Sequence, residues 1–181
     1  MPKFIADLLD LLRFRFQPLS HYVYPAWQPL GWLALAAILG GSASTEVQAA
    51  LPGKLAFFFV LTLAETAFLS IWLMVWWKWV LRRPFTGSLF PLLTLCTGPQ
   101  FLVPLVALLP PRSSAIILLT IAIYNLVLMV SAVAAALEER RRTVLLGMMA
   151  YLPLALIFSQ LTHRLMAGWG WIAWPVAPVG S

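Results

Sequence analysis

Charged residues are scarce in this chain. They make up 10% of its 181 residues, whereas soluble domains average roughly 25%. Hydrophobic residues make up 62%, and a soluble fold of this length cannot hide so much apolar surface from water. Intrinsic disorder is excluded as well, because disordered segments are poor in hydrophobic residues. The composition therefore indicates an integral membrane protein.

Cysteine and histidine are almost missing, which limits cofactor chemistry. Cys96 is the one cysteine, so the chain has no disulfide framework and no cysteine-based metal cluster. Because Cys96 has no basic neighbour in its apolar stretch, we expect an inert packing residue. The topology predicted below places His21 and His163 at opposite membrane surfaces, about 30 Å apart. They therefore cannot share a haem within one chain, and we predict two interfacial histidines and no bound cofactor or metal.

The patterns of the common catalytic sites are also missing. The sequence has no glycine-rich phosphate loop, no GxSxG, no HExxH and no CxxC. Its serines and tyrosines lack a nearby base. The net charge of +6 is divided among short clusters and forms no face that would track a nucleic acid. We predict that the chain is not an enzyme and does not bind nucleic acid.

The chain does have long apolar runs, which predict an all-α polytopic transmembrane bundle forming a single membrane domain over residues 1–181. Five spans are expected, at about 26–41, 55–81, 85–109, 114–137 and 144–163. The first is short against the roughly 20 residues that a spanning helix needs. The third contains Pro91, Pro99 and Pro104, which bend a helix and leave carbonyl groups that only protein or water can satisfy. We therefore expect the third span inside the bundle.

The two ends of the chain carry interfacial patterns. Residues 1–16 place apolar side chains on one helical face and charged side chains on the other, which predicts an amphipathic helix lying in the membrane interface. The alternative is a helix that packs on the bundle or on a partner subunit. Residues 164–181 are rich in tryptophan and interrupted by proline, so we expect an interfacial tail along the membrane surface.

The basic residues indicate how the spans are oriented. Three of the 12 Lys and Arg residues, Lys54, Arg112 and Arg164, fall on one side of the predicted membrane and nine fall on the other. The nine are Lys3, Arg13, Arg15, Lys78, Arg82, Arg83, Arg140, Arg141 and Arg142. Since Lys and Arg concentrate in cytoplasmic loops, we predict an inner (cytoplasmic) membrane protein with its N-terminus in the cytoplasm and its C-terminus outside. The same bias fits an organelle membrane.

Glu65 is the one acidic residue inside a well-defined span. It lies about 15 Å along the second span, at about 1.5 Å per residue, where an ionised carboxylate is costly. Tyr124 and Asn125 of the fourth span and Gln100 of the third fall near the same depth. One interpretation of this polar cluster is a proton, cation or substrate site. The other is a protonated Glu65 hydrogen-bonded to Asn125, which joins two helices.

A second candidate site is the basic run after the fourth span. Arg140, Arg141 and Arg142 follow two glutamates in a predicted cytoplasmic connection. Such a run binds anionic lipid headgroups or the acidic surface of a partner protein. The alternative is that it only stops translocation of the chain.

The order of segments from Arg83 to Tyr151 is distinctive. A basic turn precedes FTGSLFPLLTLCTGPQFLVPLVALLP, an aliphatic helix follows with YNLVLMVSAVAAAL, and a charged turn leads into ERRRTVLLGMMAYLPLAL. This order, together with five spans and a cytoplasmic N-terminus, resembles the divergent bacterial branch of the Yip-type integral membrane family, named for Ypt/Rab interaction. The resemblance implies a membrane scaffold or accessory protein whose partners are other membrane proteins, and it implies no catalytic residues.

Three functions follow from these patterns as hypotheses. The first is a non-enzymatic inner-membrane scaffold or accessory subunit that interacts with membrane lipids, with other integral membrane proteins or with copies of itself. The second is a small proton- or cation-coupled permease or channel that uses Glu65. The third is a membrane subunit of a redox or photosynthetic complex.

Overall fold

A computed structural model of the chain describes residues 2–43, 47, 49–106 and 109–173. These residues form helices joined by turns and loops, and no strand occurs among them. The elements are, in chain order, α1 (Pro2–Leu12), the 3-10 helix η1 (Leu19–His21), α2 (Trp27–Ala43), α3 (Leu51–Val75), the π-helix η2 (Trp76–Val80), α4 (Phe90–Cys96), the 3-10 helix η3 (Gly98–Leu102), α5 (Val103–Val106), α6 (Pro111–Ala136) and α7 (Arg141–Gly168). The predicted all-helical fold class is confirmed for this part of the chain.

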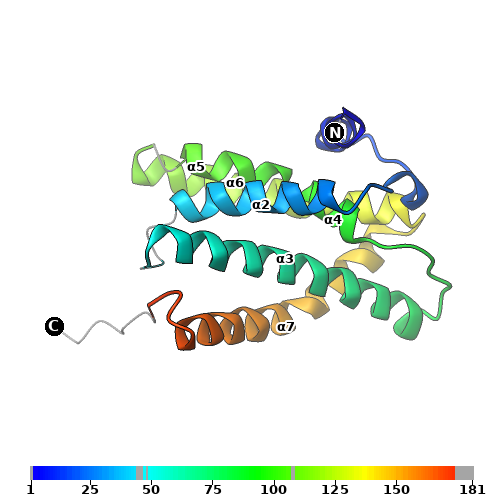
Figure 1. The fold of residues 1–181 in the computed structure, drawn as a ribbon. Helices are drawn as coiled ribbons and strands as arrows, with labels where there is room; N and C mark the ends of the chain where they lie inside the picture. Colours follow the sequence, from blue (N-terminus) through cyan, green and yellow to red (C-terminus); the bar gives the residue numbers. More distant parts are fainter. Residues whose placement is uncertain (1, 44–46, 48, 107–108, 174–181) are drawn as a thin grey trace.

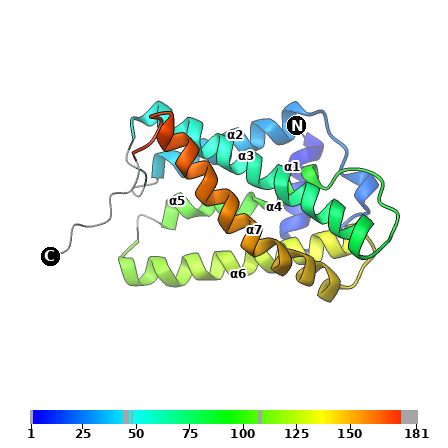
Figure 2. The same cartoon turned by 90° about the horizontal axis from the view of Figure 1, so that it is seen from below.

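The long helices lie side by side (Figure 1). α3 packs against both α2 and α7, and α6 packs against α4 and α7. Figure 2 shows α7 crossing α6 close to the start of α7, after which the two helices diverge. α1 is seen end-on in Figure 1 and so lies across the direction of the other helices. Successive long segments run in opposite directions, which gathers their connections at two ends of the bundle.

The two ends differ in charge. We call the basic end the one formed by α1 and by residues 13–26, 78–89 and 137–142. The opposite end is where α2 and α7 end and where α3 and α6 begin. The nine Lys and Arg residues that the sequence grouped on one side all lie on segments of the basic end. The fold therefore keeps together the basic clusters that the sequence predicted to share one membrane surface.

Three helices are long and apolar enough to cross a membrane. They cover Leu51–Val80, Ser113–Ala136 and Arg141–Gly168, with 30, 24 and 28 residues. They correspond to the predicted second, fourth and fifth spans. The last one continues beyond the predicted end at residue 163, so residues 164–168 are helical and do not begin a tail. Of the predicted tail, residues 174–181 lie outside the described residues.

The other two predicted spans are shorter. The first corresponds to α2, which has 17 residues. The third differs from the single bent helix expected over 85–109, because among the described residues of this range only Phe90–Val106 is helical, and it is divided into α4, η3 and α5. The divisions follow from the prolines, since Pro99 opens η3 and Pro104 lies in the first turn of α5, where a missing backbone N–H costs no hydrogen bond. α4 is well inside the bundle, as expected, and Leu92 to Cys96 are buried.

The N-terminal helix packs on the bundle. α1 ends at Leu12, short of the predicted residue 16. Phe4, Leu8 and Leu11 form its buried face, and the helix contacts α4, η3 and α6. The sequence left two alternatives for this segment, a helix in the membrane interface or a helix packed on the bundle or on a partner subunit. The structure shows the contact with the bundle. Ile5 and Leu9 are exposed at 44% and 48%, which leaves an apolar stripe beside the contact face.

The larger hydrophobic core lies toward the basic end. It joins α1, the end of α3, α4, the last turns of α6 and the start of α7. Small residues of α6 allow close contact between helices, since Ala132, Ala134 and Ala136 are buried. α3 and α7 meet where the indole Nε1 of Trp72 donates to the Gly147 carbonyl at 2.9 Å. A second, smaller cluster lies near the opposite end.

Candidate functional site: the groove at the basic end

Among the described residues, no hydrogen bond joins any two of the four residues of the predicted midplane cluster. Tyr124 donates its hydroxyl to the Leu12 carbonyl of α1, at 2.5 Å. Gln100 is exposed in η3. Asn125 is half-buried on α6, and its Oδ1 atom has no hydrogen-bond partner among the described residues. Glu65 lies on α3, whose main neighbours are α2 and α7 rather than α6.

Glu65 faces α7 instead. It is half-buried, and its backbone carbonyl accepts a hydrogen bond from the Tyr151 hydroxyl at 3.5 Å. His163 lies further along α7, beside Phe57 of α3. The His163 ring packs edge-on against Phe57, with ring centroids 4.8 Å apart, and its Nδ1 atom lies 2.9 Å from the Ser159 carbonyl oxygen. The sequence predicts His163 only as an interfacial residue. Its contact with Phe57 could not be predicted, because that contact depends on how α3 and α7 pack against each other.

A polar cluster at the basic end holds α1 in place. The Asp7 carboxylate accepts hydrogen bonds from the Tyr24 hydroxyl at 2.5 Å and lies 2.9 Å from His21 Nε2. Lys3 donates to the His21 carbonyl at 2.7 Å, and its ammonium lies 5.1 Å from the centre of the Tyr24 ring. No local sequence pattern predicts this cluster, because it joins α1 to a loop and depends on how the loop folds back.

Tyr24 donates to Asp7 over the whole neutral range. Burial raises the pKa of Tyr24, and the hydrogen bond to the Asp7 carboxylate and its charge raise the pKa further. The phenol therefore remains protonated, as the hydrogen bond requires. Tyr24 is also a lining residue of the groove described next, so Asp7 fixes one wall of that groove.

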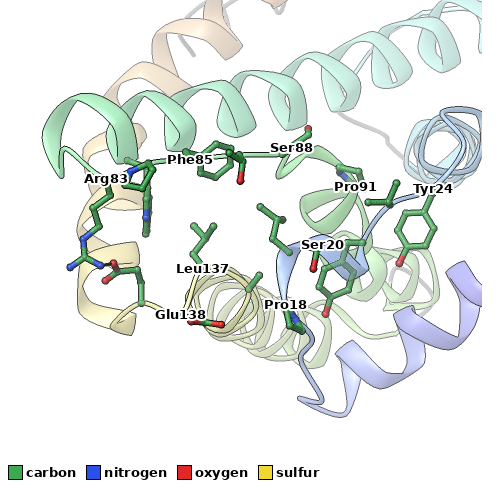
Figure 3. Close-up of a pocket in the computed structure, with 18 residues that line it drawn as sticks. Pro18, Ser20, Tyr24, Arg83, Phe85, Ser88, Pro91, Leu137 and Glu138 are labelled. Carbon is green, nitrogen blue, oxygen red and sulfur yellow. Dashed lines mark ion pairs between the residues drawn. The ribbon is translucent and has the colours of Figure 1, made fainter.

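A groove of about 940 Å³ opens at the basic end (Figure 3). Its three walls are the segment 18–24, the connection 83–91 and the end of α6 with its following turn at 136–139. The lining is mixed, with aromatic and aliphatic side chains, hydroxyl groups and charges of both signs. The lining includes Tyr22, Tyr24, Trp77, Arg83, Phe85, Ser88, Leu137, Glu138 and Glu139.

An ion pair between Arg83 and Glu139 closes one edge of the groove (Figure 3). Arg83 follows η2 and Glu139 follows α6, so the pair joins two walls. The Glu139 side chain is 8% exposed, whereas that of Arg83 is 58% exposed. The carboxylate is therefore a buried charge that depends on a half-exposed arginine.

Both members of this pair follow a strained residue. Arg82 and Glu138 have φ angles of 52° and 53°, a left-handed conformation that costs a residue with a Cβ about 1–2 kcal/mol. At α6 the turn is a Schellman motif, in which the Glu139 N–H donates to the Ala134 carbonyl at 2.8 Å. The related turn after η2 has the Arg83 N–H donating to the Trp77 carbonyl at 3.1 Å. The left-handed residues Arg82 and Glu138 turn the chain directly before Arg83 and Glu139, which form the ion pair.

The predicted basic run lies beside the groove. Arg140 is the N-cap residue of α7, and Arg141 and Arg142 open its first turn. All three are exposed. Cations at a helix N-terminus oppose the helix dipole, so these arginines do not stabilise α7. An anionic partner, such as lipid phosphate, would remove that conflict.

Cys96 is completely buried in α4. Among the described residues, no group of three or more His, Cys, Asp or Glu side chains is arranged to hold a metal ion. The polar contacts that join segments at the basic end are instead the Asp7–Tyr24 hydrogen bond and the Arg83–Glu139 ion pair. Comparison of the chain with protein-family models, with curated proteins and with solved structures finds no match.

Proposed function

We propose that this chain is a non-enzymatic integral membrane protein that acts as a scaffold or accessory subunit, with lipids and other membrane proteins as its partners. The observation that carries the proposal is the outward-facing apolar surface of its long helices. In their most apolar stretches, only 17%, 28% and 22% of the residues are buried inside the bundle. Ile116, Leu119 and Ile123 of α6, for example, are 68%, 62% and 55% exposed. Such a surface is suited to acyl chains or to other apolar helices.

The proposed topology has five crossings of an inner membrane. α2 and the segment Phe90–Val106 run alongside the three long helices (Figures 1 and 2). The basic end faces the cytoplasm by the charge rule, and α1 lies along the interface with Ile5 and Leu9 toward the lipid. The order of segments from Arg83 to Tyr151 resembles that of the Yip-type family, and this resemblance implies an accessory role.

The test is gentle purification into nanodiscs followed by mass spectrometry of the retained proteins. A stoichiometric membrane-protein partner, or a defined oligomer of this chain, is the expected result. A single copy with no protein partner after in-cell crosslinking would contradict the accessory role. An absorption spectrum of the same fraction tests the redox or photosynthetic hypothesis, because a bound pigment or haem would be coloured.

A second candidate function is proton- or cation-coupled transport. It is favoured by Glu65, a half-buried acidic residue within the long apolar helix Leu51–Val80, because an acidic residue at that depth is costly unless it has a function or a partner. Ion flux in proteoliposomes that E65Q abolishes, and that E138Q at the basic end leaves intact, would support transport. Absence of flux in the wild-type protein would end this candidate.

A further inference from the structure

The Arg83–Glu139 ion pair has features that stability alone does not account for. Glu139 is a buried carboxylate, and replacing such a pair by apolar residues is often neutral or stabilising. The residues before both members are strained. Backbone strain of this kind gathers at ligand sites. The pair also lies on the lining of an open groove rather than in a packed core.

We propose that the groove binds the headgroup of a zwitterionic aminophospholipid, of the phosphatidylethanolamine type. The proposal rests on the membrane location given under Proposed function. Without lipid, Arg83 and Glu139 neutralise each other. With lipid bound, the headgroup phosphate pairs with the Arg83 guanidinium and the headgroup ammonium pairs with the Glu139 carboxylate. Four charges of alternating sign then replace two, and Arg83 and Glu139 each keep a partner of opposite charge.

The charges of the lining favour a zwitterion over a singly charged lipid. Arg83 contributes one positive charge, while Glu138 and Glu139 contribute two negative charges. A purely anionic headgroup would take Arg83 and leave the Glu139 carboxylate buried and unpaired, which is strongly unfavourable. A purely cationic ligand would pair with the carboxylates alone and would make no use of the Arg83 guanidinium. Glu138 gives the ammonium a second carboxylate within the same lining.

The remaining lining fits an amphipathic molecule at a membrane surface. Trp77, Phe85 and Leu137 supply apolar and aromatic surface, which suits a glycerol backbone and the first methylene groups of acyl chains. The hydroxyl of Ser88 accepts a hydrogen bond from the Phe90 N–H at 3.2 Å, so its own hydrogen remains available to a phosphate oxygen. An ammonium donates hydrogen bonds to carboxylates, which a quaternary choline headgroup cannot do.

The test is native mass spectrometry of the full chain, released from nanodiscs that contain equal amounts of phosphatidylethanolamine, phosphatidylcholine and phosphatidylglycerol. We expect preferential retention of phosphatidylethanolamine. The double variant R83Q/E139Q keeps the net charge of the protein. In this variant the ratio of retained phosphatidylethanolamine to the other two lipids should fall about tenfold, which is the factor for one charge-assisted hydrogen bond. The matched control is D10N/R15Q, which removes an exposed ion pair (N···O 3.9 Å) at the same end and should retain the preference.

Each other outcome counts against the site. Equal retention of the three lipids, or preference for phosphatidylglycerol, would overturn the proposal. A preference that R83Q/E139Q leaves unchanged would place the lipid elsewhere and overturn the assignment to this groove. If R83Q/E139Q does not fold, a photoactivatable phosphatidylethanolamine on the wild-type protein decides, since crosslinks must fall on residues 18–24, 83–91 or 136–139.

Soluble glycerophosphoethanolamine in excess should compete only weakly, because it lacks the acyl chains. Loss of all protein partners would contradict the accessory role while leaving this lipid preference intact, so the two proposals fail separately.

Discussion

The basic end and the opposite end of the bundle are built in different ways. At the basic end, charged and polar side chains join segments that are distant in sequence, through Asp7 with Tyr24 and through Arg83 with Glu139. At the opposite end, Phe57, Met166 and Ile172 form a small apolar cluster. The groove of about 940 Å³ at the basic end has charges of both signs in its lining, whereas the described lining of a smaller pocket of about 630 Å³ at the opposite end, which includes Gly53 and Trp171, carries no charged side chain. The comparison indicates that ligand chemistry belongs to the basic end and that the opposite end is structural.

The largest effect is expected when the basic-end ion pair loses its cation. R83M leaves the buried Glu139 carboxylate unpaired and should lower the free energy of unfolding by about 3 kcal/mol, the lower part of the range for such pairs because Arg83 is half-exposed. The double variant R83M/E139L removes both charges and should be close to the wild type in stability. Tryptophan fluorescence during thermal unfolding in detergent measures both. Equal destabilisation by the single and double variants would show that the pair is not the cause.

The opposite end should respond to volume instead of charge. A Cβ added at Gly53 would collide with the Trp171 carbonyl oxygen, so G53A should cost about 2 kcal/mol, as overpacking does. Gly168 lies at the same end with nothing within 4 Å of an added Cβ. G168A is therefore the matched control and should leave the melting temperature unchanged or slightly higher. Similar losses in both variants would contradict tight packing at Gly53.

Alkaline pH should weaken the basic end through Tyr24. The pKa of Tyr24 is raised above its ordinary value of 10.0 by burial and by Asp7, so its contribution is complete below pH 10 and is lost as the pH rises further. Y24F removes the hydrogen bond to a charged acceptor and should cost about 1.5 kcal/mol at neutral pH. Melting temperatures between pH 7 and pH 11 should fall less steeply for Y24F than for the wild type. Parallel curves would exclude Tyr24 as the titrating group.

The smallest effect concerns the helix ends. Glu138 is left-handed in a Schellman turn, a place where glycine is preferred. E138G should raise the free energy of unfolding by about 1 kcal/mol. α7 ends in a comparable turn with Gly170 at φ 73°, so G170A should change stability by a similar amount in the opposite direction. Thermal unfolding of the two variants measures both signs.

Sequence patterns predicted the parts of the fold that depend on local composition. Long apolar runs predicted the three long helices. The prolines predicted an irregular third segment, but not that it would divide into three short helices. The extent of α1 was overestimated because residues 13–16 continue its apolar pattern, while the chain turns at Phe14, where φ is 58°.

The candidate sites depended on information that no local pattern contains. Depth along each span placed Glu65 level with Asn125, but depth does not show which helices are neighbours. The packing places Glu65 against α7 and Tyr124 against α1. The groove could not be predicted either, because its walls come from three connections whose proximity is a result of the complete fold.

The proposed five-span topology requires the basic end and the opposite end to lie at different membrane surfaces. Single cysteines at Ser88 and at Gly168, each in a C96A background, report this when intact cells are treated with a membrane-impermeant thiol reagent. We expect the cysteine at Gly168 to be labelled from outside, and the cysteine at Ser88 to be labelled only after the membrane is opened. Labelling of both positions from the same side would contradict five crossings and the cytoplasmic placement of the groove.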